Sequence, residues 1–458
     1  MFNTQSLLSS QSKLHDDLQT TQPDRKISDS QPRQSQIKPI KANPSIVQIV
    51  HQLERHTSMI SRELGRNKGH INYSFFEMKV GIISAIHNQV GGSNFLRPAA
   101  LGLKAVSKKT LNKLEICMKA VVVNRLALPG QSNIPLLLDS EVPYPTCQPH
   151  DILVRVEAVA VNPIDLKMLR AKQSPQGPDR VLGWDVAGKV VEVGAEVTGF
   201  QLGDDVFYAG SVIRPGACSE IHGVDARLVG HKPKTLSFVQ AAALPLTCLA
   251  AWEALFDRMH LARTTLHSPA TLLVIGGAGG VGSMALQFAS KLTGLRVIGT
   301  ASRPESRAYC LEMGAADVID HSQPLMSQLK ALAVTAVDYV LCLSDAAPLM
   351  IQLAEIMAPQ GHVCALTEAS TDLPMNLLRG KSITFSWEGM FTRSMFKTAD
   401  MPRQGDILHE VSKLVDSGVL KTHLQVELGA INAANVMKAH HLIGTGRMIG
   451  KVAMAGFD

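Results

Sequence analysis

The segment TLLVIGGAGGVGSMALQFASKL, residues 271–292, constrains the fold more than any other part of the sequence. Its apolar run 272–275 is typical of a buried parallel strand. The run leads at once into Gly277-x-Gly279-x-x-Gly282, and apolar residues at helical spacing follow over 284–292. A strand before the glycines and a helix after them is the context that identifies a nucleotide-binding turn.

Each glycine of this turn is required for a different physical reason. One allows the tight turn, one lets the backbone approach a pyrophosphate, and one permits close packing of helix on strand, while the helix amino terminus faces the phosphates. We therefore predict that Gly277, Gly279, Gly280, Val281 and Gly282 bind a dinucleotide cofactor. A glycine-rich turn with a purely structural role is the alternative.

The alternation of strands and helices continues after this unit. Helical stretches such as ESRAYCLEMG separate the first of five further predicted strands, RVIGTA (296–301), ADVID (316–320), VDYVLCL (337–343), GHVCALT (361–367) and SITFSW (382–387). Six strands of this kind predict an α/β fold with a doubly wound parallel sheet.

The first quarter of the chain differs in character. Of 45 Lys and Arg and 39 Asp and Glu, residues 1–117 hold 16 and 8, a balance of +8, so the remainder balances at −2. Residues 1–45 have the Gln/Ser/Pro-rich composition of a disordered segment. Residues 46–70 show helical spacing, and ERHTSMISRELGRNKG resembles the helix-turn-helix of IS30-type transposases, with Ser61, Arg62, Arg66 and Asn67 on its second helix. We predict a basic, partly disordered and partly helical extension, a fused remnant or an over-extended start; the alternative to the helix-turn-helix is a weakly folded basic segment. We expect no nucleic-acid partner except one that residues 46–70 alone would bind.

The chain from about 118 to 458 resembles the medium-chain dehydrogenase/reductase superfamily, and within it the zinc-type alcohol dehydrogenase-like proteins that border on the quinone oxidoreductases. The motifs that carry the resemblance are HDILVRVEAVAVNPID, VLGWDVAGKVVEVGAEVTGFQLGDDVF, AAALPLTCLAAWEAL, GGAGGVGS, LEMGAADVIDH and GRMIGKV. The resemblance implies a GroES-like, β-rich catalytic domain over 118–245, a Rossmann domain over 246–385, and a tail over 386–458 that completes the catalytic domain. It also implies a homodimer acting on a small molecule, with Thr247 and Lys451 as further cofactor-binding residues.

At the positions where the family resemblance implies zinc ligands, this chain does not have a set of residues that binds zinc. A catalytic zinc site of this kind needs three soft or borderline ligands. Asn162 stands where a cysteine ligand is expected, and Gly183-Trp184-Asp185 replaces Gly-His-Glu. Cys248 matches a third ligand position, but one thiol cannot hold the ion. The four-cysteine structural lobe is also missing, since 203–230 contains only Cys218. We predict that the protein binds no metal.

Hydride transfer without a metal suits an acceptor that delocalises the negative charge it receives. A quinone or an α,β-unsaturated carbonyl does so, and modest hydrogen bonds then suffice. We predict Asn162 as an uncharged donor near the nicotinamide, and Asp165 as a helix cap or ribose partner; the alternative is that Asn162-Pro163 only shapes a turn. Three rival functions remain open: a zinc alcohol dehydrogenase with unusual ligands, a DNA-binding redox-sensing regulator, and a structural protein that merely binds nucleotide.

The choice between NAD and NADP is predicted from the residues at the end of the predicted strand 296–301, the second strand of the nucleotide-binding unit. An enzyme that prefers NAD places an acid about 20 residues past the glycine turn, but here the sequence reads Thr300-Ala301-Ser302-Arg303. A hydroxyl and a guanidinium can bind a 2′-phosphate by charge-assisted hydrogen bonds. We predict NADPH, with Ser302 and Arg303 as phosphate ligands and Arg307 as an auxiliary, while Glu305 serves the next helix's dipole.

Two further features bear on the environment of the chain. No apolar run reaches the ~18–20 residues of a membrane span, and the amino-terminal residues lack a signal-peptide pattern, so we expect a cytoplasmic protein without a membrane partner. The seven cysteines contain no CxxC pair, which predicts reduced and mostly buried thiols rather than disulfides.

Overall fold

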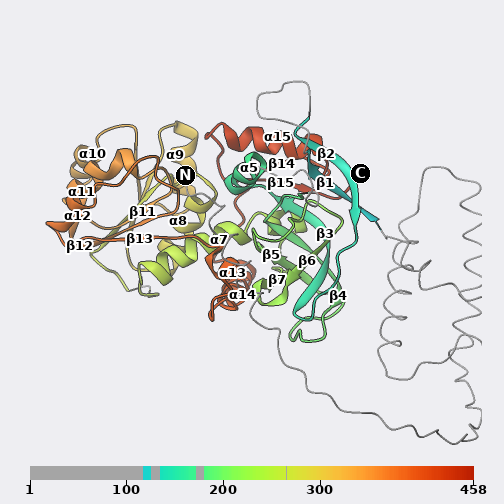
Figure 1. Cartoon of the computed structure of the whole chain (residues 1–458). Helices are drawn as coiled ribbons and strands as arrows, with labels where there is room; N and C mark the ends of the chain where they lie inside the picture. The colour runs from blue at the N-terminus through green and yellow to red at the C-terminus, as the bar shows by residue number, and fades with distance from the viewer. Residues whose placement is uncertain (1–116, 125–134, 172–179, 265) are drawn as a thin grey trace, which may run out of the picture. The chain divides into compact units, whose positions relative to one another are not determined.

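The computed structural model describes residues 117–124, 135–171, 180–264 and 266–458. The predictions for residues 1–116, the helix-turn-helix at 46–70 among them, lie outside the described residues. The chain divides into two compact units, and all the described residues belong to the second, Asn94–Asp458. Within this unit Figure 1 shows two sheets, each with its own helices, and α7 between them.

The first sheet is the predicted parallel one, and it has six strands in the order β10-β9-β8-β11-β12-β13. All its pairings are parallel, so the doubly wound α/β prediction is confirmed. Its strands are β8 (Thr271–Ile275), β9 (Arg296–Thr300), β10 (Asp317–Ile319), β11 (Val337–Cys342), β12 (Met357–Ala365) and β13 (Thr384–Trp387). Strand β12 begins at Met357, earlier than the sequence predicts. Gln360 within it has a left-handed backbone (φ 64°), and the register on β11 shifts between Val337 and Tyr339.

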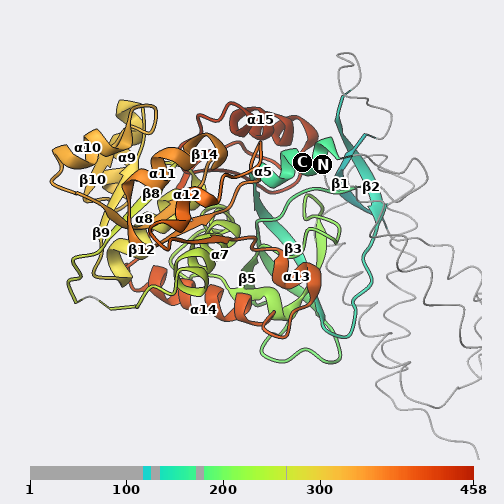
Figure 2. The same ribbon diagram turned by 60° about the vertical axis from the view of Figure 1, so that its left-hand side comes forward.

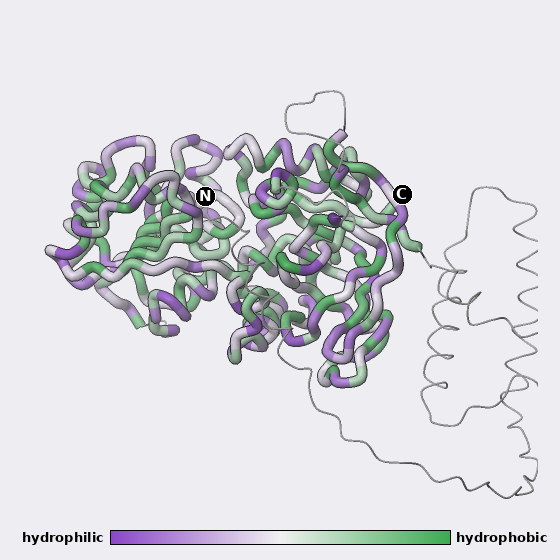
Figure 3. Tube along the Cα trace, viewed as in Figure 1, coloured by the Kyte–Doolittle hydropathy of each residue, from purple (hydrophilic) through white to green (hydrophobic). Residues whose placement is uncertain are grey.

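Helices cover both faces of this sheet. Leu273 and Ile275 of β8 belong to a cluster with residues of α10, α11 and α12. Leu272 and Val274 are equally buried and point to the opposite face, because side chains alternate along a strand. Figure 3 shows the strands as a hydrophobic interior. The helices are α8 (Gly280–Leu292), α9 (Pro304–Glu312), α10 (Leu325–Ala331), η4 (Ala347–Leu349), α11 (Met350–Ile356) and α12 (Asn376–Arg379).

The second sheet belongs to the part of the chain for which the family resemblance implies a β-rich catalytic domain, and we call it the catalytic part. Its path is β14-β15-β3-β4-β5-β7, and β6 pairs with β3, which makes seven strands. The C-terminal tail supplies β14 and β15, and β15 pairs with β3. The strands are β3 (Asp151–Ala160), β4 (Val186–Val193), β5 (Asp205–Tyr208), β6 (Ile221–Asp225), β7 (Val229–His231), β14 (Leu424–Glu427) and β15 (Lys451–Ala455); β1 (Cys117–Val123) and β2 (Leu137–Pro143) form a separate ribbon.

The remaining helices lie on the catalytic part or between it and the Rossmann sheet, as Figure 2 shows for α7, α14 and α15. They are α5 (Pro163–Arg170), η2 (Ala226–Leu228), α6 (Phe238–Ala242), α7 (Pro245–Trp252), the π-helix η3 (Glu253–Arg258), α13 (Thr392–Phe396), α14 (Arg403–Asp416) and α15 (Ala433–Gly444). The expectation that no run reaches the length of a membrane span is wrong by length and composition, because the helical run Phe238–Arg258 passes that test. However, 83% of its most apolar window is buried inside the protein. Its packing against α8 is that of a core helix.

Candidate functional site

The glycine turn has the geometry that the sequence predicts. It connects β8 to α8, with Gly276 in a left-handed conformation (φ 85°) and Gly279 as the N-cap of the helix. The backbone N–H of Gly277 donates to Thr300 O at 3.1 Å, which fixes the turn against the end of β9. The amino terminus of α8 therefore opens at the carboxyl edge of the sheet, where nucleotides bind in folds of this class.

Steric contacts explain why these positions are glycine. A Cβ at Gly282 would lie 2.3 Å from Gly276 O, and one at Gly277 would lie 3.1 Å from Cys310 Sγ. A Cβ at Gly279 would meet only Gly276 O, at 3.6 Å, among the described atoms within 4 Å. Helix and strand are thus packed too closely for side chains, while the backbone at Gly279 is open on its outer side. These residues fit a bound pyrophosphate.

Two predicted cofactor residues from elsewhere in the chain reach the same turn. A Cβ at Gly280 would meet Thr247 Cγ2 at 3.0 Å and Lys451 Cδ at 3.1 Å. The adjacent Gly450 donates its N–H to Ala278 O at 2.9 Å. The catalytic part therefore contacts the phosphate turn directly through α7 and the start of β15.

The predicted 2′-phosphate ligands lie after β9. Ser302 is exposed and Arg303 is half-buried. The Arg303 guanidinium donates to Arg447 O at 2.7 Å and pairs with Glu305 at 3.2 Å. These contacts hold the guanidinium beside the turn, so Glu305 serves Arg303 as well as the first turn of α9. Binding of a phosphate by Ser302 and Arg303 stays a prediction.

Arg307 has a structural contact that the sequence did not reveal. Its guanidinium donates to Ala301 O at 3.3 Å and to Val318 O at 2.7 Å. It thereby ties the end of β9 to β10. An auxiliary role toward a phosphate remains a prediction for its other N–H groups.

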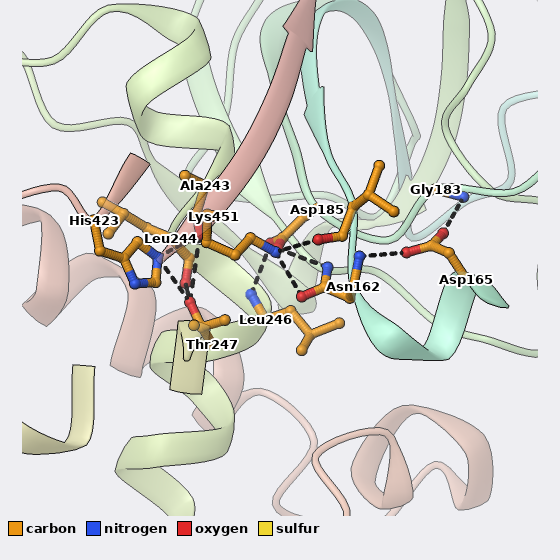
Figure 4. Close-up of polar contacts among 12 residues, drawn as sticks. Asn162, Asp165, Gly183, Asp185, Ala243, Leu244, Leu246, Thr247, His423 and Lys451 are labelled. Carbon is orange, nitrogen blue, oxygen red and sulfur yellow. Dashed lines mark hydrogen bonds and ion pairs between the residues drawn. The ribbon is translucent and has the colours of Figure 1, made fainter. Parts of the chain in front are cut away.

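The centre of the catalytic part is a buried ion pair with an amide beside it (Figure 4). The ammonium of Lys451 donates to Asp185 Oδ2 at 2.7 Å, to Asn162 Oδ1 at 2.6 Å and to Val161 O at 2.9 Å. The Asn162 amide donates in turn to Asp185 Oδ2 at 2.9 Å. The backbone N–H of Leu246, at the start of α7, donates to Asp185 Oδ1 at 2.8 Å. We call Asn162, Asp185 and Lys451 the buried triad.

Within the triad, the charge of Asp185 is matched by that of Lys451, and every hydrogen of the ammonium has an acceptor. Burial raises the pKa of Asp185, and the ammonium of Lys451 counteracts that effect. An ammonium carries three hydrogens, and each of those on Lys451 has one of the three acceptors named above. The orientation of the Asn162 amide also follows from chemistry, since its oxygen faces an ammonium and its nitrogen faces a carboxylate.

Asp165 has the contacts of a helix cap. It is the third residue of α5, and its Oδ2 accepts the backbone N–H of Asn162 at 2.8 Å in a capping box. Its Oδ1 accepts the N–H of Gly183 at 3.0 Å. Burial raises the pKa of Asp165 to about 7, and these two backbone donors oppose the shift. Of the two predicted roles, cap or ribose partner, the geometry supports the cap.

The predicted metal positions do not assemble into a zinc site. Asn162 is engaged in the triad, and the indole of Trp184 donates to Ser211 O at 3.1 Å. Cys248 is fully buried, which raises the pKa of its thiol well above the ordinary value. No group of three His, Cys, Asp or Glu side chains within the described ranges could hold a metal ion. The donor set does not fit zinc.

Sequence reasoning missed His423, which connects the two parts of the molecule. This buried side chain lies before β14, and its Nε2 donates to Ala243 O at 2.7 Å. Its Nδ1 lies 2.9 Å from Ser283 Oγ on α8. Burial lowers the pKa of His423 to about 4, so it is neutral and acts as a hydrogen-bonded bridge. A single histidine in KTHLQVE carries no sequence signal for this role.

A buried acidic pair was also missed. Glu253 of η3 and Glu388, directly after β13, are both buried. Arg393 contacts Glu253 at 2.8 Å and Arg258 contacts Glu388 at 2.9 Å. Burial and then Glu253 raise the pKa of Glu388 to about 8. The available signal was an acid inside an apolar stretch, as in LAAWEALF and FSWEGMF.

Comparison with known proteins identifies the family to which the chain belongs. Residues 148–243 match the alcohol dehydrogenase GroES-like domain, and residues 280–403 match the zinc-binding dehydrogenase family. A zinc-type alcohol dehydrogenase-like protein of Staphylococcus aureus is 38% identical over 315 residues, which cover 68% of this chain and 92% of that protein. The chain belongs to the zinc-type alcohol dehydrogenase-like proteins of the medium-chain dehydrogenase/reductase superfamily.

Further relatives agree with this family. The crystal structure of a Rhizobium etli protein described as a zinc-dependent alcohol dehydrogenase is 46% identical, with a TM-score of 0.70, and the match covers 75% of this chain and 99% of that one. A chloroplastic NADPH-dependent alkenal/one oxidoreductase of Arabidopsis thaliana is 28% identical over 327 residues, which cover 70% of this chain and 75% of that protein. The family resemblance read from the motifs is confirmed, and with it an oxidoreductase that uses a nicotinamide cofactor.

Proposed function

We propose that this protein is a zinc-independent, NADPH-dependent reductase of quinones or α,β-unsaturated carbonyl compounds. The observation that carries the proposal is the buried triad. The Lys451 ammonium, held by Asn162, Asp185 and Val161 O, supplies a positive charge beside Asn162, which stands where the family resemblance implies a cysteine ligand of zinc. Asn162 and Asp185 therefore surround a lysine cation, and these side chains do not form a ligand set that suits a metal ion.

The triad leaves one donor for chemistry. A carboxamide nitrogen carries two hydrogens, and Asp185 accepts one of those on Asn162. The described residues offer the second hydrogen no further acceptor. A delocalised enolate or phenolate needs less stabilisation than a localised alkoxide, so a neutral N–H can suffice for it, whereas the alkoxide calls for a Lewis acid. The proposed role of Asn162 is to donate this hydrogen bond.

The cofactor fits the turn at 276–282. The backbone of Gly279 and Gly280 would hold the pyrophosphate, and Ser302 with Arg303 would hold the 2′-phosphate. Bound NADPH would supply the hydride. The name of the plant relative, an NADPH-dependent alkenal/one oxidoreductase, supports the same cofactor and acceptor class, as does the lack of an acid at 300–303.

The deciding experiment is turnover in the presence of a chelator. The full chain, purified in EDTA, is given NADPH with a quinone or an enal, and oxidation of NADPH is followed by absorbance. We expect an undiminished rate, and no gain on adding zinc. Loss of activity on chelation that zinc restores would favour a zinc alcohol dehydrogenase, and absence of turnover with every acceptor would favour a protein that merely binds nucleotide.

We also propose a homodimer that forms through β13. This strand is an edge of the six-stranded sheet, with one side unpaired in the described residues. Unpaired edges are templates for pairing with another chain. Trp387 in this strand is 48% exposed, and Met375, Leu377, Met395 and Phe396 are exposed apolar residues of neighbouring elements. Light scattering of the full chain should give twice the monomer mass, and Trp387→Lys should lower it.

A further inference from the structure

Two side chains, Thr247 of α7 and Lys451 of β15, cover the glycine turn at Gly280, where a Cβ would meet them at 3.0 and 3.1 Å. Both residues are hydrogen-bonded to His423, which lies beside them in Figure 4. The ring Nε2 of His423 is 3.2 Å from Thr247 Oγ1. Its backbone carbonyl accepts the N–H of Lys451 at 3.0 Å. One residue therefore holds both of the side chains that pack on the phosphate turn.

The imidazole of His423 also binds the helix that follows the turn. Its Nε2 donates to Ala243 O at 2.7 Å, so Nδ1 of the neutral ring carries no hydrogen and is an acceptor. Ser283 Oγ lies 2.9 Å from this Nδ1 and 2.9 Å from Gly280 O. The serine hydroxyl is therefore the donor to His423. His423 thus joins the first turn of α8 to the two side chains that pack on Gly280.

All of these contacts are shielded from water. His423 and Ser283 have no exposed surface, and Thr247 and Lys451 are only 2% and 4% exposed. A buried polar group that loses its partner cannot replace it with water, so such contacts are costly to break. The arrangement therefore resists a shift of α7 or β15 relative to α8.

The chain that leads to His423 is also docked on α8 by contacts that do not involve the imidazole. Gln287 lies one helical turn after Ser283. Its side-chain oxygen accepts the backbone N–H of Lys421 at 2.9 Å, and its side-chain nitrogen donates to Lys421 O at 3.2 Å. The segment 421–423 should therefore stay on α8 when the imidazole is replaced.

The glycine turn has its own attachment to the Rossmann sheet. The N–H of Gly276 donates to Thr300 Oγ1 at 3.0 Å, and the N–H of Gly277 donates to Thr300 O at 3.1 Å. Loss of the imidazole therefore leaves the turn itself in place. It releases the positions of Thr247 and Lys451 over the turn, and with Lys451 the buried triad.

We propose that His423 is a positioning residue for the dinucleotide, which sets Thr247 and Lys451 over the phosphate turn and so aligns the turn with the buried triad. The inference rests on the proposed function, because it takes the dinucleotide to extend from the turn to Asn162. A ligand that occupies only the Rossmann part does not need this alignment, whereas a whole dinucleotide does.

The test compares the binding of NADPH with that of 2′,5′-ADP, its adenosine half, by calorimetry on the full chain without an acceptor. His423→Leu keeps an apolar side chain and removes both ring contacts. We expect this variant to bind NADPH at least about tenfold more weakly than the wild type and 2′,5′-ADP within about twofold of it. A role confined to folding would weaken both ligands alike. Equal weakening of the two, or unchanged binding of NADPH, overturns the proposal.

A conservative variant and a double variant identify the contact that matters. His423→Asn keeps an acceptor near the position of Nδ1, so it should bind NADPH within about threefold of the wild type. Ser283→Ala removes the donor to Nδ1. The double variant His423→Leu/Ser283→Ala should bind NADPH within about twofold of His423→Leu alone, because both changes break the same hydrogen bond. An Asn variant as weak as His423→Leu, or losses that multiply in the double variant, overturns the proposal.

His440 of α15 supplies a matched control. It is 2% exposed, and burial lowers its pKa to about 4, as it does for His423. Neither of its ring nitrogens has a hydrogen-bond partner within the described ranges. His440→Leu should therefore leave the affinities for NADPH and 2′,5′-ADP unchanged. If it weakens NADPH alone as His423→Leu does, the effect does not come from the contacts of His423 and the proposal is overturned.

The same measurements separate this proposal from the proposed function. If His423→Leu selectively weakens NADPH but no quinone or enal is reduced, the reductase proposal fails and the positioning role stands. If acceptors are reduced and His423→Leu binds both ligands as the wild type does, the positioning role is wrong and the reductase stands. A wild type that binds NADH in place of NADPH fails only the choice of cofactor, and NADH is then compared with AMP in the same variants. If the wild type binds neither dinucleotide, both proposals fail.

Discussion

Replacing Lys451 by methionine is the sharpest test of the buried triad. Methionine keeps the length and apolar stem of the side chain and removes only the ammonium. Asp185, which is fully buried, then loses its cation, and Val161 O and Asn162 Oδ1 lose their donor. The two other donors to Asp185, the Asn162 amide and the Leu246 N–H, stay in place.

The expected loss of unfolding free energy is large. Removing one partner of a buried ion pair costs about 3–5 kcal/mol, because the remaining charge is left uncompensated. The loss should depend on pH. Without the ammonium the folded-state pKa of Asp185 rises further above its unfolded value, so folding is favoured when Asp185 is protonated. The penalty should therefore be smaller near pH 5 and grow as the pH rises toward 8.

The measurement is urea unfolding of the full chain, followed by tryptophan fluorescence. Trp184, adjacent to Asp185 and buried, reports on the region that is changed. The double variant Lys451→Met/Asp185→Asn should lose less than the sum of the two single variants, because it removes both charges. A loss below about 1 kcal/mol in Lys451→Met, or single losses that simply add in the double variant, would refute the reasoning.

Three further predictions concern other parts of the molecule. Glu388→Gln should be more stable than the wild type at pH 9 and should lose this advantage toward pH 5. The pKa of Glu388 is about 8 in the folded protein and ~4.3 in an unfolded chain, so the stability of the wild type declines as pH rises between these values. Melting temperatures measured across this pH range check the prediction, and a difference that does not depend on pH contradicts it. Arg303→Ala should raise the KM for NADPH at least about tenfold, or about 1.4 kcal/mol, and hardly change that for NADH; equal weakening, or a wild type that prefers NADH, shows that the residues after β9 do not select the phosphate. Asn162→Asp keeps an acceptor for Lys451 but removes the free N–H together with the N–H that Asp185 accepts, so kcat with an enal should fall about 10²–10³-fold while the KM for NADPH changes little; an unchanged kcat removes Asn162 from the chemistry.

The sequence alone determined the Rossmann part and the nature of its turn. The run 272–275, the glycines and the helical spacing after them are local signals, and each is a direct consequence of how neighbouring residues fit a strand, a turn and a helix. The same holds for the zinc ligands, whose absence is a matter of residue type at Asn162 and Trp184. The boundaries of individual strands depend on pairing with neighbouring strands as well as on local sequence, as the early start of β12 shows.

The buried triad could be found only in three dimensions. Lys451 and Asn162 are 289 residues apart in the chain, and nothing in GRMIGKV says whether this lysine turns toward a phosphate or into the catalytic sheet. The pairing of β15 with β3 decides it, because it carries the ammonium to the end of the strand that precedes Asn162.

His423 and the pair Glu253–Glu388 depend on tertiary structure in the same way. Each joins elements that are far apart in sequence, and each is buried where those elements pack together. Burial and charged neighbours set the pKa values of such groups, and neither is encoded in the residues next to them. Local sequence therefore determined which elements form, and the packing of those elements decided which polar side chains meet.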